Sequence, residues 1–94
     1  MARQYRRERV RFVVDEPVEV EDGVMLPAGE YPGLMEQHGY DGLDGVSWAP
    51  PEYKIEVSAK KWGEMGGKVE RDLVSTVIDL SRQVMSGKVE VEGD

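Results

Sequence analysis

Three side chains that could bind a metal or move a proton lie in one glycine-rich segment, HGYDGLDG. His38, Asp41 and Asp44 supply an imidazole and two carboxylates there. Carboxylates at this spacing could hold calcium, but the segment lacks the order of an EF-hand loop and its terminal glutamate. A solvated loop whose aspartates stabilise turns explains the same residues. We therefore predict no metal site.

Catalysis would have to use His38, the single histidine of the chain. The absence of cysteine excludes thiolate chemistry and leaves too few nitrogen and sulfur ligands for a structural zinc site. No serine or cysteine nucleophile lies beside His38 in the sequence, although the fold could bring Ser47 to it. We expect no catalytic residue and no cofactor, and keep a small enzyme using His38 as an alternative.

The segment GEMGGK invites comparison with a phosphate-binding loop. The Walker pattern requires a glycine where this chain has Trp62 and a hydroxyl where it has Val69. A glycine hinge between two helical segments explains the motif instead.

Charge is distributed unevenly along the chain, whose formal net charge is −7. Residues 1–11 carry five arginines and one acid, whereas residues 12–94 carry seven basic groups and eighteen acids. An acidic body favours encounter with basic proteins and repels nucleic acid. We therefore expect a basic protein partner, such as a nucleic-acid-binding protein, and no direct binding of nucleic acid. No run approaches the ~20 apolar residues of a membrane span, so we expect a cytoplasmic protein without membrane contact.

The first arginines fall into two groups. Arg7, Arg9 and Arg11 alternate with other residues, which places them on the solvent face of one strand. Glutamates of a neighbouring strand, over 18–21 or 89–92, would pair with them across the sheet. Arg3 and Arg6 precede this pattern and form a free N-terminal arginine arm, too small for an ordinary DNA-binding site.

The predicted contact surface combines the loop YDGLDGVSWAPPEY with acidic strand faces. Trp48, in a proline-rich loop, has the character of an interface anchor. The predicted partner-binding residues are Glu19, Glu21, Tyr40, Asp41, Asp44 and Trp48. A specific form of this function is an inhibitor whose carboxylates mimic the phosphates of nucleic acid. The alternative is a nucleic-acid accessory or assembly subunit that uses Arg3 and Arg6.

Short strands position these residues. Alternation predicts strands over 7–14, 18–21 and 53–58, and Asp22-Gly23 predicts a hairpin turn before a short strand that breaks at Pro27. Ser58 is expected to cap a helical turn over 59–65. KVEVEG predicts a closing strand. Glycines and prolines punctuate residues 31–51, which predicts a loop with at most a brief strand over 33–37.

A helix is predicted over about 69–86. At 100° per residue its apolar residues form two adjacent stripes, and Gly87 stands where a C-cap glycine belongs. The β-branched segment LVSTVI shows no alternation, which argues against a strand. One stripe would pack on the sheet. The second stripe, left for loops or a homodimer contact, contains Val74, Ile78 and Met85.

Together these elements predict an α+β fold. The sheet would be small, bent and antiparallel, or an SH3-like partly open barrel, with one C-terminal amphipathic helix and a final short strand. The strand-rich first half, with its DG and LPAG turns, is similar to the small SH3-like barrels. We expect a flexible basic arm over 1–6 and a single compact acidic domain over 7–94.

Overall fold

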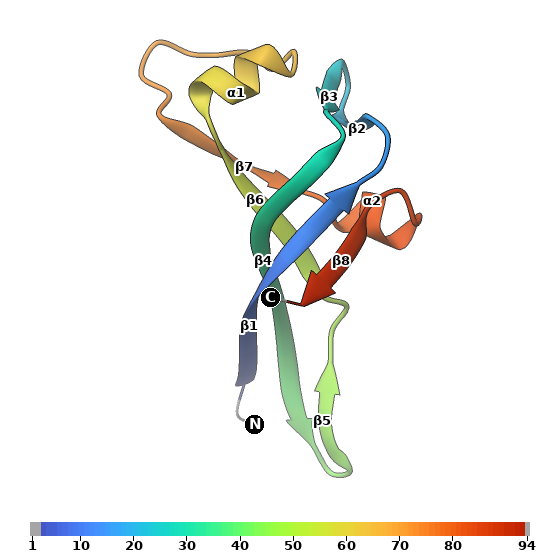
Figure 1. Cartoon of the computed structure of the whole chain (residues 1–94). Coiled ribbons are helices and arrows are strands. Elements are labelled where there is room, and N and C mark those ends of the chain that lie inside the picture. Colours follow the sequence, from blue (N-terminus) through green and yellow to red (C-terminus); the bar gives the residue numbers. More distant parts are fainter. Residues whose placement is uncertain (1–2, 94) are drawn as a thin grey trace.

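The computed structural model describes residues 3–93, and this part of the chain is mostly β-sheet (Figure 1). The strands are β1 (Arg3–Val14), β2 (Val18–Glu21), β3 (Val24–Leu26), β4 (Gly29–Gly42), β5 (Gly45–Trp48), β6 (Glu52–Ser58), β7 (Ser75–Asp79) and β8 (Glu90–Gly93). The helices are α1 (Ala59–Glu64) and α2 (Ser81–Met85). Strands account for 58% of the structure and helices for 12%.

The antiparallel pair of β1 and β4 forms the centre of the main sheet. All of β1 is in register with β4, from Arg3 opposite Tyr40 to Val14 opposite Gly29. The strand order is β7-β6-β4-β1-β8, with β5 paired to the far end of β4, while β2 and β3 form a separate hairpin. Because β8 covers only residues 10–13 of β1, and β6 only residues 34–36 of β4, the other ends of the central pair project from the body (Figure 1).

The hydrophobic core lies against one half of the central pair. Val10, Phe12 and Val14 point inward from β1, because alternate residues of a strand face the same side. The rest of the core comes from β2, β3, β6, β7 and the segments around both helices: Val18, Val24, Leu26, Ile55, Val57, Met65, Ile78, Leu80 and Val89. No residue of β1 from Arg3 to Arg9 is buried. The core therefore stabilises the body and leaves the projecting end without burial of its own.

Several predicted elements are confirmed. Strands are present over 18–21, 53–58 and the end of the chain, and the turn at Asp22-Gly23 has the positive φ of 80° at Gly23 that a hairpin turn requires. Ser58 caps α1, since its Oγ accepts a hydrogen bond from the Lys61 backbone N–H at 3.1 Å. The first strand is longer than predicted, because it begins at Arg3 and not at Arg7.

The arginine ladder is confirmed at one position. Arg11 lies opposite Glu92 of β8 and forms an ion pair with it, and Glu30 lies 3.9 Å from the Arg11 guanidinium. Arg7 and Arg9 lie beyond the end of β8 and form no ion pair with any described acid. The prediction that all three arginines pair with glutamates is wrong for these two, because the described part of β8 does not reach them and Glu36, which lies opposite Arg7 on β4, forms an ion pair with Lys54 instead.

The segment predicted to be a loop, residues 31–51, contains the longest strand of the structure, β4. Its glycines are tolerated because large neighbours need the space: a Cβ at Gly33 would collide with the Phe12 ring. Pro32 is tolerated because β6 pairs with β4 only from Leu34, so one edge of β4 carries no strand at the proline. The glycines and prolines that predicted a loop therefore lie within a strand, against which neighbouring side chains pack closely.

The predicted C-terminal helix over 69–86 is wrong, and with it the α+β fold class. The segment contains β7 and the short helix α2, and no helix in the described residues reaches seven residues. The strand does alternate: Thr76 and Ile78 face Val57 and Ile55 of β6, while Val77 faces outward at 58% exposed. Sequence inspection missed this alternation because the inward Thr76 is polar and the outward Val77 is apolar.

The homodimer stripe does not exist as predicted, because it required that helix. Ile78 is 3% exposed in the core, whereas Val74 is exposed in the loop before β7 and Met85 is exposed in α2. The structure is a six-stranded sheet with a separate hairpin, and the predicted SH3-like barrel with a helix across it is likewise wrong. Within residues 3–93, no helix has the length and apolar character needed to cross a membrane.

Substitutions at two neighbouring residues test strand β7. Ile78→Ala should lower the free energy of unfolding by about 2–4 kcal/mol, because it removes buried methyl groups from the core. Val77→Ala should lower it by less than about 1 kcal/mol, because the side chain faces solvent. Urea unfolding of the two variants measures the difference. Equal and large losses at both positions would instead support a helix that buries both residues.

Candidate functional site

The projecting end of the main sheet is the most distinctive surface of the molecule. We call it the β-arm and define it as residues 3–9 and 37–48, which include the ends of β1 and β4, the turn at 43–44 and β5 (Figure 1). Its three strands are held by the β1–β4 and β4–β5 pairings. Gly39 is the single residue of the β-arm that is buried. Both faces of this small sheet are therefore open to solvent.

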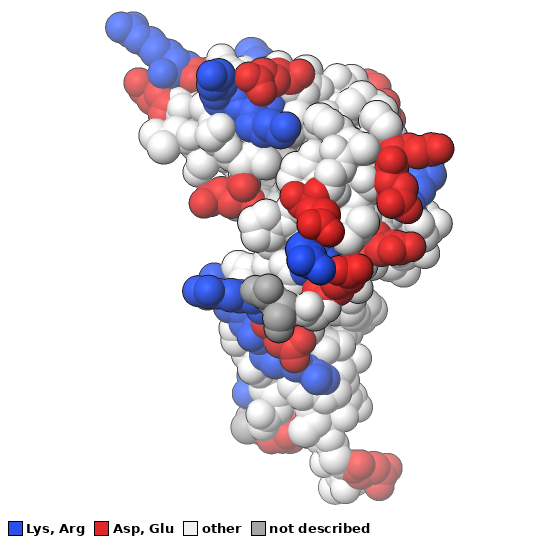
Figure 2. All heavy atoms as spheres, viewed as in Figure 1, with Lys and Arg blue, Asp and Glu red and all other residues white. Residues whose placement is uncertain are grey.

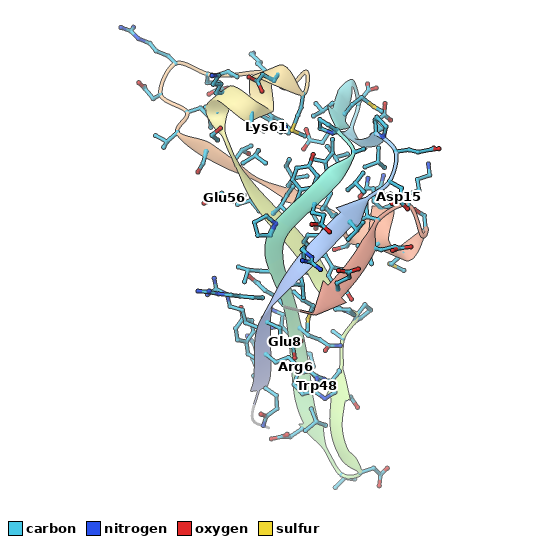
Figure 3. The ribbon with its side chains drawn as sticks, in the orientation of Figure 1. Arg6, Glu8, Asp15, Trp48, Glu56 and Lys61 are labelled. Carbon is cyan, nitrogen blue, oxygen red and sulfur yellow. The ribbon has the colours of Figure 1, made fainter. Side chains whose placement is uncertain are left out.

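Arg6, Gly39 and Trp48 form a layered contact on the core-side face of the β-arm. The Arg6 guanidinium carbon lies 3.9 Å from the centroid of the Trp48 ring (Figure 3). The indole lies over Gly39, where an added Cβ would be 2.8 Å from a ring carbon of Trp48. A cation–π contact at an exposed site contributes about 0.5–1 kcal/mol. The contact holds both side chains in a defined position on the surface.

Two hydrogen bonds further order this face. The Gln4 side-chain amide donates to the Asp41 carboxylate at 3.2 Å, and the Gln37 amide donates to the backbone oxygen of Ala49 at 2.8 Å. Gln4 joins β1 to β4, and Gln37 joins β4 to the residue after β5. The β-arm is therefore stabilised by polar and aromatic contacts between strands where a core is absent.

The opposite face of the β-arm is basic and aromatic. Arg3, Arg7 and Arg9 lie on it as alternate residues of β1, and each is exposed and has no acidic partner among the described residues. Tyr5 lies between Arg3 and Arg7 and is 53% exposed. Tyr40, opposite Arg3 on β4, is 49% exposed. Figure 2 shows basic side chains gathered along the lower part of the molecule, over the β-arm.

His38 lies on this face and contacts Tyr5, with ring centroids 5.1 Å apart. No hydrogen bond joins His38 to Ser47 in the described structure, and residues 3–93 contain no cluster of three metal-ligating side chains. The structure thus places His38 against Tyr5 on this face of the β-arm.

The tip of the β-arm is apolar. Leu43, in the turn between β4 and β5, is fully exposed, and Val46 and Trp48 of β5 are 40% and 39% exposed. Exposed tryptophan, tyrosine and arginine are the residues enriched at the energetic centres of protein interfaces. Asp44 lies in the same turn and is exposed.

A second charged surface lies at the other end of the molecule, which is 48 Å long. We call residues 15–22 the acidic end, because this segment carries five acids and no base: Asp15, Glu16, Glu19, Glu21 and Asp22. All five are exposed, and none forms an ion pair with a described residue. Asp15 and Trp48, labelled in Figure 3, lie on the body and on the β-arm respectively.

A groove separates the acidic end from α2. It consists of two adjoining hollows of about 460 and 830 Å³, which share Glu21, Asp22, Arg82 and Gln83. We call it the hairpin groove. Gln83 is 9% exposed, and its Nε2 donates to the Glu19 backbone oxygen at 2.9 Å. Because a carbonyl can only accept, this bond fixes the amide orientation, and the buried Oε1 has no partner among the described residues.

The structure thus divides the predicted partner-binding residues between two places. Tyr40, Asp41, Asp44 and Trp48 lie together on the β-arm, and Arg3 and Arg6, predicted to be a separate free arm, lie beside them in β1. Residues 1 and 2 of that predicted arm lie outside the described residues. Glu19 and Glu21 lie at the acidic end. The Asp41 carboxylate accepts a hydrogen bond from the Gln4 amide, so it is less available to a partner than predicted.

Sequence reasoning missed four residues that the structure brings into the two surfaces. Tyr5 and Leu43 could have been found as large apolar residues beside charges or glycines. Gly39 and Gln83 could not, because their roles depend on which side chains lie across the sheet and beside the hairpin.

A charged cluster at the base of the β-arm involves Lys54 of β6. Its Nζ lies 3.8 Å from Glu36 and 3.4 Å from Glu52. The Glu36 carboxylate raises the pKa of Lys54 above its ordinary value, desolvation opposes this, and Glu52 and Asp79 raise it further. The cluster joins β6 to β4 where the β-arm leaves the body.

Replacement of Gly39 tests the layered contact. In a Trp62→Phe background, which leaves Trp48 as the single tryptophan, Gly39→Ala should displace the indole and increase the quenching of its fluorescence by acrylamide. Gly42→Ala is the matched control, because a Cβ at Gly42 would make an ordinary contact of 3.5 Å. Unchanged quenching in both variants would show that Trp48 does not lie over Gly39 in solution.

The Lys54 cluster predicts a defined pH dependence. Lys54→Met should lower the free energy of unfolding at neutral pH by less than about 1 kcal/mol, because the pair is partly exposed and screened. Since the folded-state pKa is raised, this stabilisation is complete below the unfolded-state pKa of about 10.4 and is lost as the pH rises through the folded-state value. Urea unfolding of both proteins at several pH values measures it. A difference that grows in alkali would contradict the assignment.

Comparison with protein-family models, with curated proteins and with solved structures finds no match to this chain. A functional conclusion therefore rests on the two surfaces described above.

Proposed function

We propose that this protein is a non-enzymatic binding protein that assembles with other proteins through the β-arm and the acidic end. The observation that carries the proposal is the β-arm itself. It presents exposed tryptophan, tyrosine, leucine and arginine on a projecting sheet that has no core of its own. Single exposed apolar residues are common on protein surfaces, but a group of them on one projecting element is typical of an interaction site.

The acidic end supports the second half of the proposal. Five exposed carboxylates that form no ion pair within residues 3–93 favour a basic protein surface, both in the rate of encounter and in orientation. An inhibitor that mimics nucleic acid is the narrower form of this idea. Arg82 and Lys88 line the hairpin groove among the carboxylates and interrupt the uniform negative charge that such mimicry needs. We therefore favour ordinary protein assembly.

Binding of nucleic acid by the β-arm is the second candidate. One observation favours it: Arg3, Arg7 and Arg9 share a face with Tyr5 and Tyr40, and single strands bind to cations interleaved with aromatic rings. Three cations fall short of the six to ten phosphate contacts of an ordinary DNA-binding protein. The acidic residue at the tip, Asp44, would also oppose a phosphate backbone.

Capture from the native host lysate tests the proposal. The wild-type chain is compared with Leu43→Ala/Trp48→Ala, which removes the apolar groups of the β-arm, and with Val69→Ala/Val74→Ala, which removes exposed apolar groups elsewhere. Bound proteins should fall by more than about tenfold in the first variant, because interface anchors dominate binding energy, and stay unchanged in the second.

A parallel sample treated with nuclease separates the two candidates. Capture that survives nuclease supports protein assembly, and capture that nuclease abolishes supports the nucleic-acid candidate. Equal capture by all three proteins would mean that the β-arm is not a binding surface.

A further inference from the structure

We infer that the hairpin groove of one copy of this protein binds the arginine face of the β-arm of a second copy, so that copies associate head to tail. This inference rests on the proposed function and names the partner. Its starting point is that the molecule carries two surfaces of opposite charge, the arginine face of the β-arm and the acidic end, which lie apart along its long axis (Figure 1).

The charges of the two surfaces are complementary. On the β-arm, Arg3, Arg7 and Arg9 are exposed and have no acidic partner among the described residues. The hairpin groove is lined by four carboxylates, against the two cations Arg82 and Lys88: Glu19, Glu21, Asp22 and Asp79. Complementary potentials direct two proteins into one orientation and exclude others. Arginine suits such a site, because its planar guanidinium donates to carboxylates in pairs.

The donors of arginine suit the groove. A guanidinium has five N–H donors and no acceptor, so it can bind several of the groove carboxylates together. Gln83 lines both hollows, and its Nε2 donates to the Glu19 backbone oxygen, which joins α2 to the acidic end and fixes the wall of the groove.

Geometry requires that the two surfaces meet between copies. The β-arm and the β2–β3 hairpin lie at opposite ends of the long axis, so a chain cannot place its β-arm in its own groove (Figure 1). A contact between two different surfaces is heterologous, and such contacts close into rings or continue as open chains. In the described structure, the residues of β1 before Val10 also have one edge that pairs with no strand, which offers backbone groups to a second copy.

Two charge-reversal variants test the inference by sedimentation analysis of the full chain. The β-arm variant is Arg3→Glu/Arg9→Glu, chosen because the residues opposite are the uncharged Tyr40 and Leu34. The groove variant is Glu19→Lys/Glu21→Lys. All four positions are exposed, so neither variant should unfold the body. Circular dichroism and the thermal midpoint verify this. Charge-matched controls are Lys60→Glu/Arg71→Glu and Glu64→Lys/Glu70→Lys, at exposed positions away from both surfaces.

At low salt the wild-type chain and both controls should show a mass that rises with concentration, and higher salt should reverse this. Each charge-reversal variant alone should associate at least about tenfold more weakly than wild type. An equimolar mixture of the two variants should associate again, because the intact β-arm of one variant fits the intact groove of the other and the two reversed surfaces are also complementary in charge. A contact between two β-arms or between two grooves would not give weakening in both single variants together with recovery in the mixture.

Three outcomes would overturn the inference. The first is that the wild-type chain remains monomeric at all concentrations. The second is that the mixture of variants remains monomeric while the wild type associates. The third is that each charge-reversal variant associates as strongly as the wild type. If self-association fails but the β-arm still captures a host protein or nucleic acid in the lysate experiment, the inference fails and a β-arm binding role remains. If both experiments fail, the proposed function fails as well.

Discussion

The pairing of β1 with β4 is the constraint on which the rest of the structure depends. The two strands stay in register along the whole of β1, but the core covers only the half that includes Val10, Phe12 and Val14. Backbone hydrogen bonds alone do not stabilise an isolated pair of strands in water. The projecting half therefore needs β5 and the contacts of Arg6 with Trp48 and Gln4 with Asp41. The same long pair thus produces a packed body at one end and an exposed surface at the other.

Glycines on one face of β4 allow this pair to carry large side chains along its length. Gly33 leaves space for Phe12 and Ile55 in the core, and Gly39 leaves space for the Trp48 ring on the β-arm. Glycine within a strand usually weakens it, and it is retained where another group must approach the backbone closely. In this protein the approach is made by a core ring at one site and by a surface ring at the other. On the β-arm, as in the core, a glycine of β4 therefore leaves room for an aromatic ring to pack against the backbone.

Charge separation along the molecule connects the fold to the proposed function. Arg3, Arg6, Arg7 and Arg9 of β1 lie beyond the described end of β8 and form no ion pair with a described acid. The acids of residues 15–22 lie where no base neighbours them in sequence. Glu92 of β8 pairs with Arg11, whereas Arg3, Arg7 and Arg9 lie outside the described pairing of the two strands and are exposed. This property depends on strand length and order more than on net charge.

The sequence by itself determined the strands with a clear period of two, the Asp22-Gly23 turn, the Ser58 cap and the uneven distribution of charge, because each depends on residues close together in the chain. It did not determine β4, because its glycines are typical of a loop when the sequence is considered alone. In the structure they leave space for aromatic rings of other strands. The sequence did not determine β7, because whether Val77 or Ile78 faces inward depends on the register with β6. Of the candidate site, Tyr40, Asp44, Trp48 and the arginines could be named in advance. The tertiary structure alone decided that these residues lie together on one projecting sheet and that Glu19 and Glu21 lie apart from them. Strand pairing brings residues together that are distant in the sequence, and no local sequence pattern shows which strands pair.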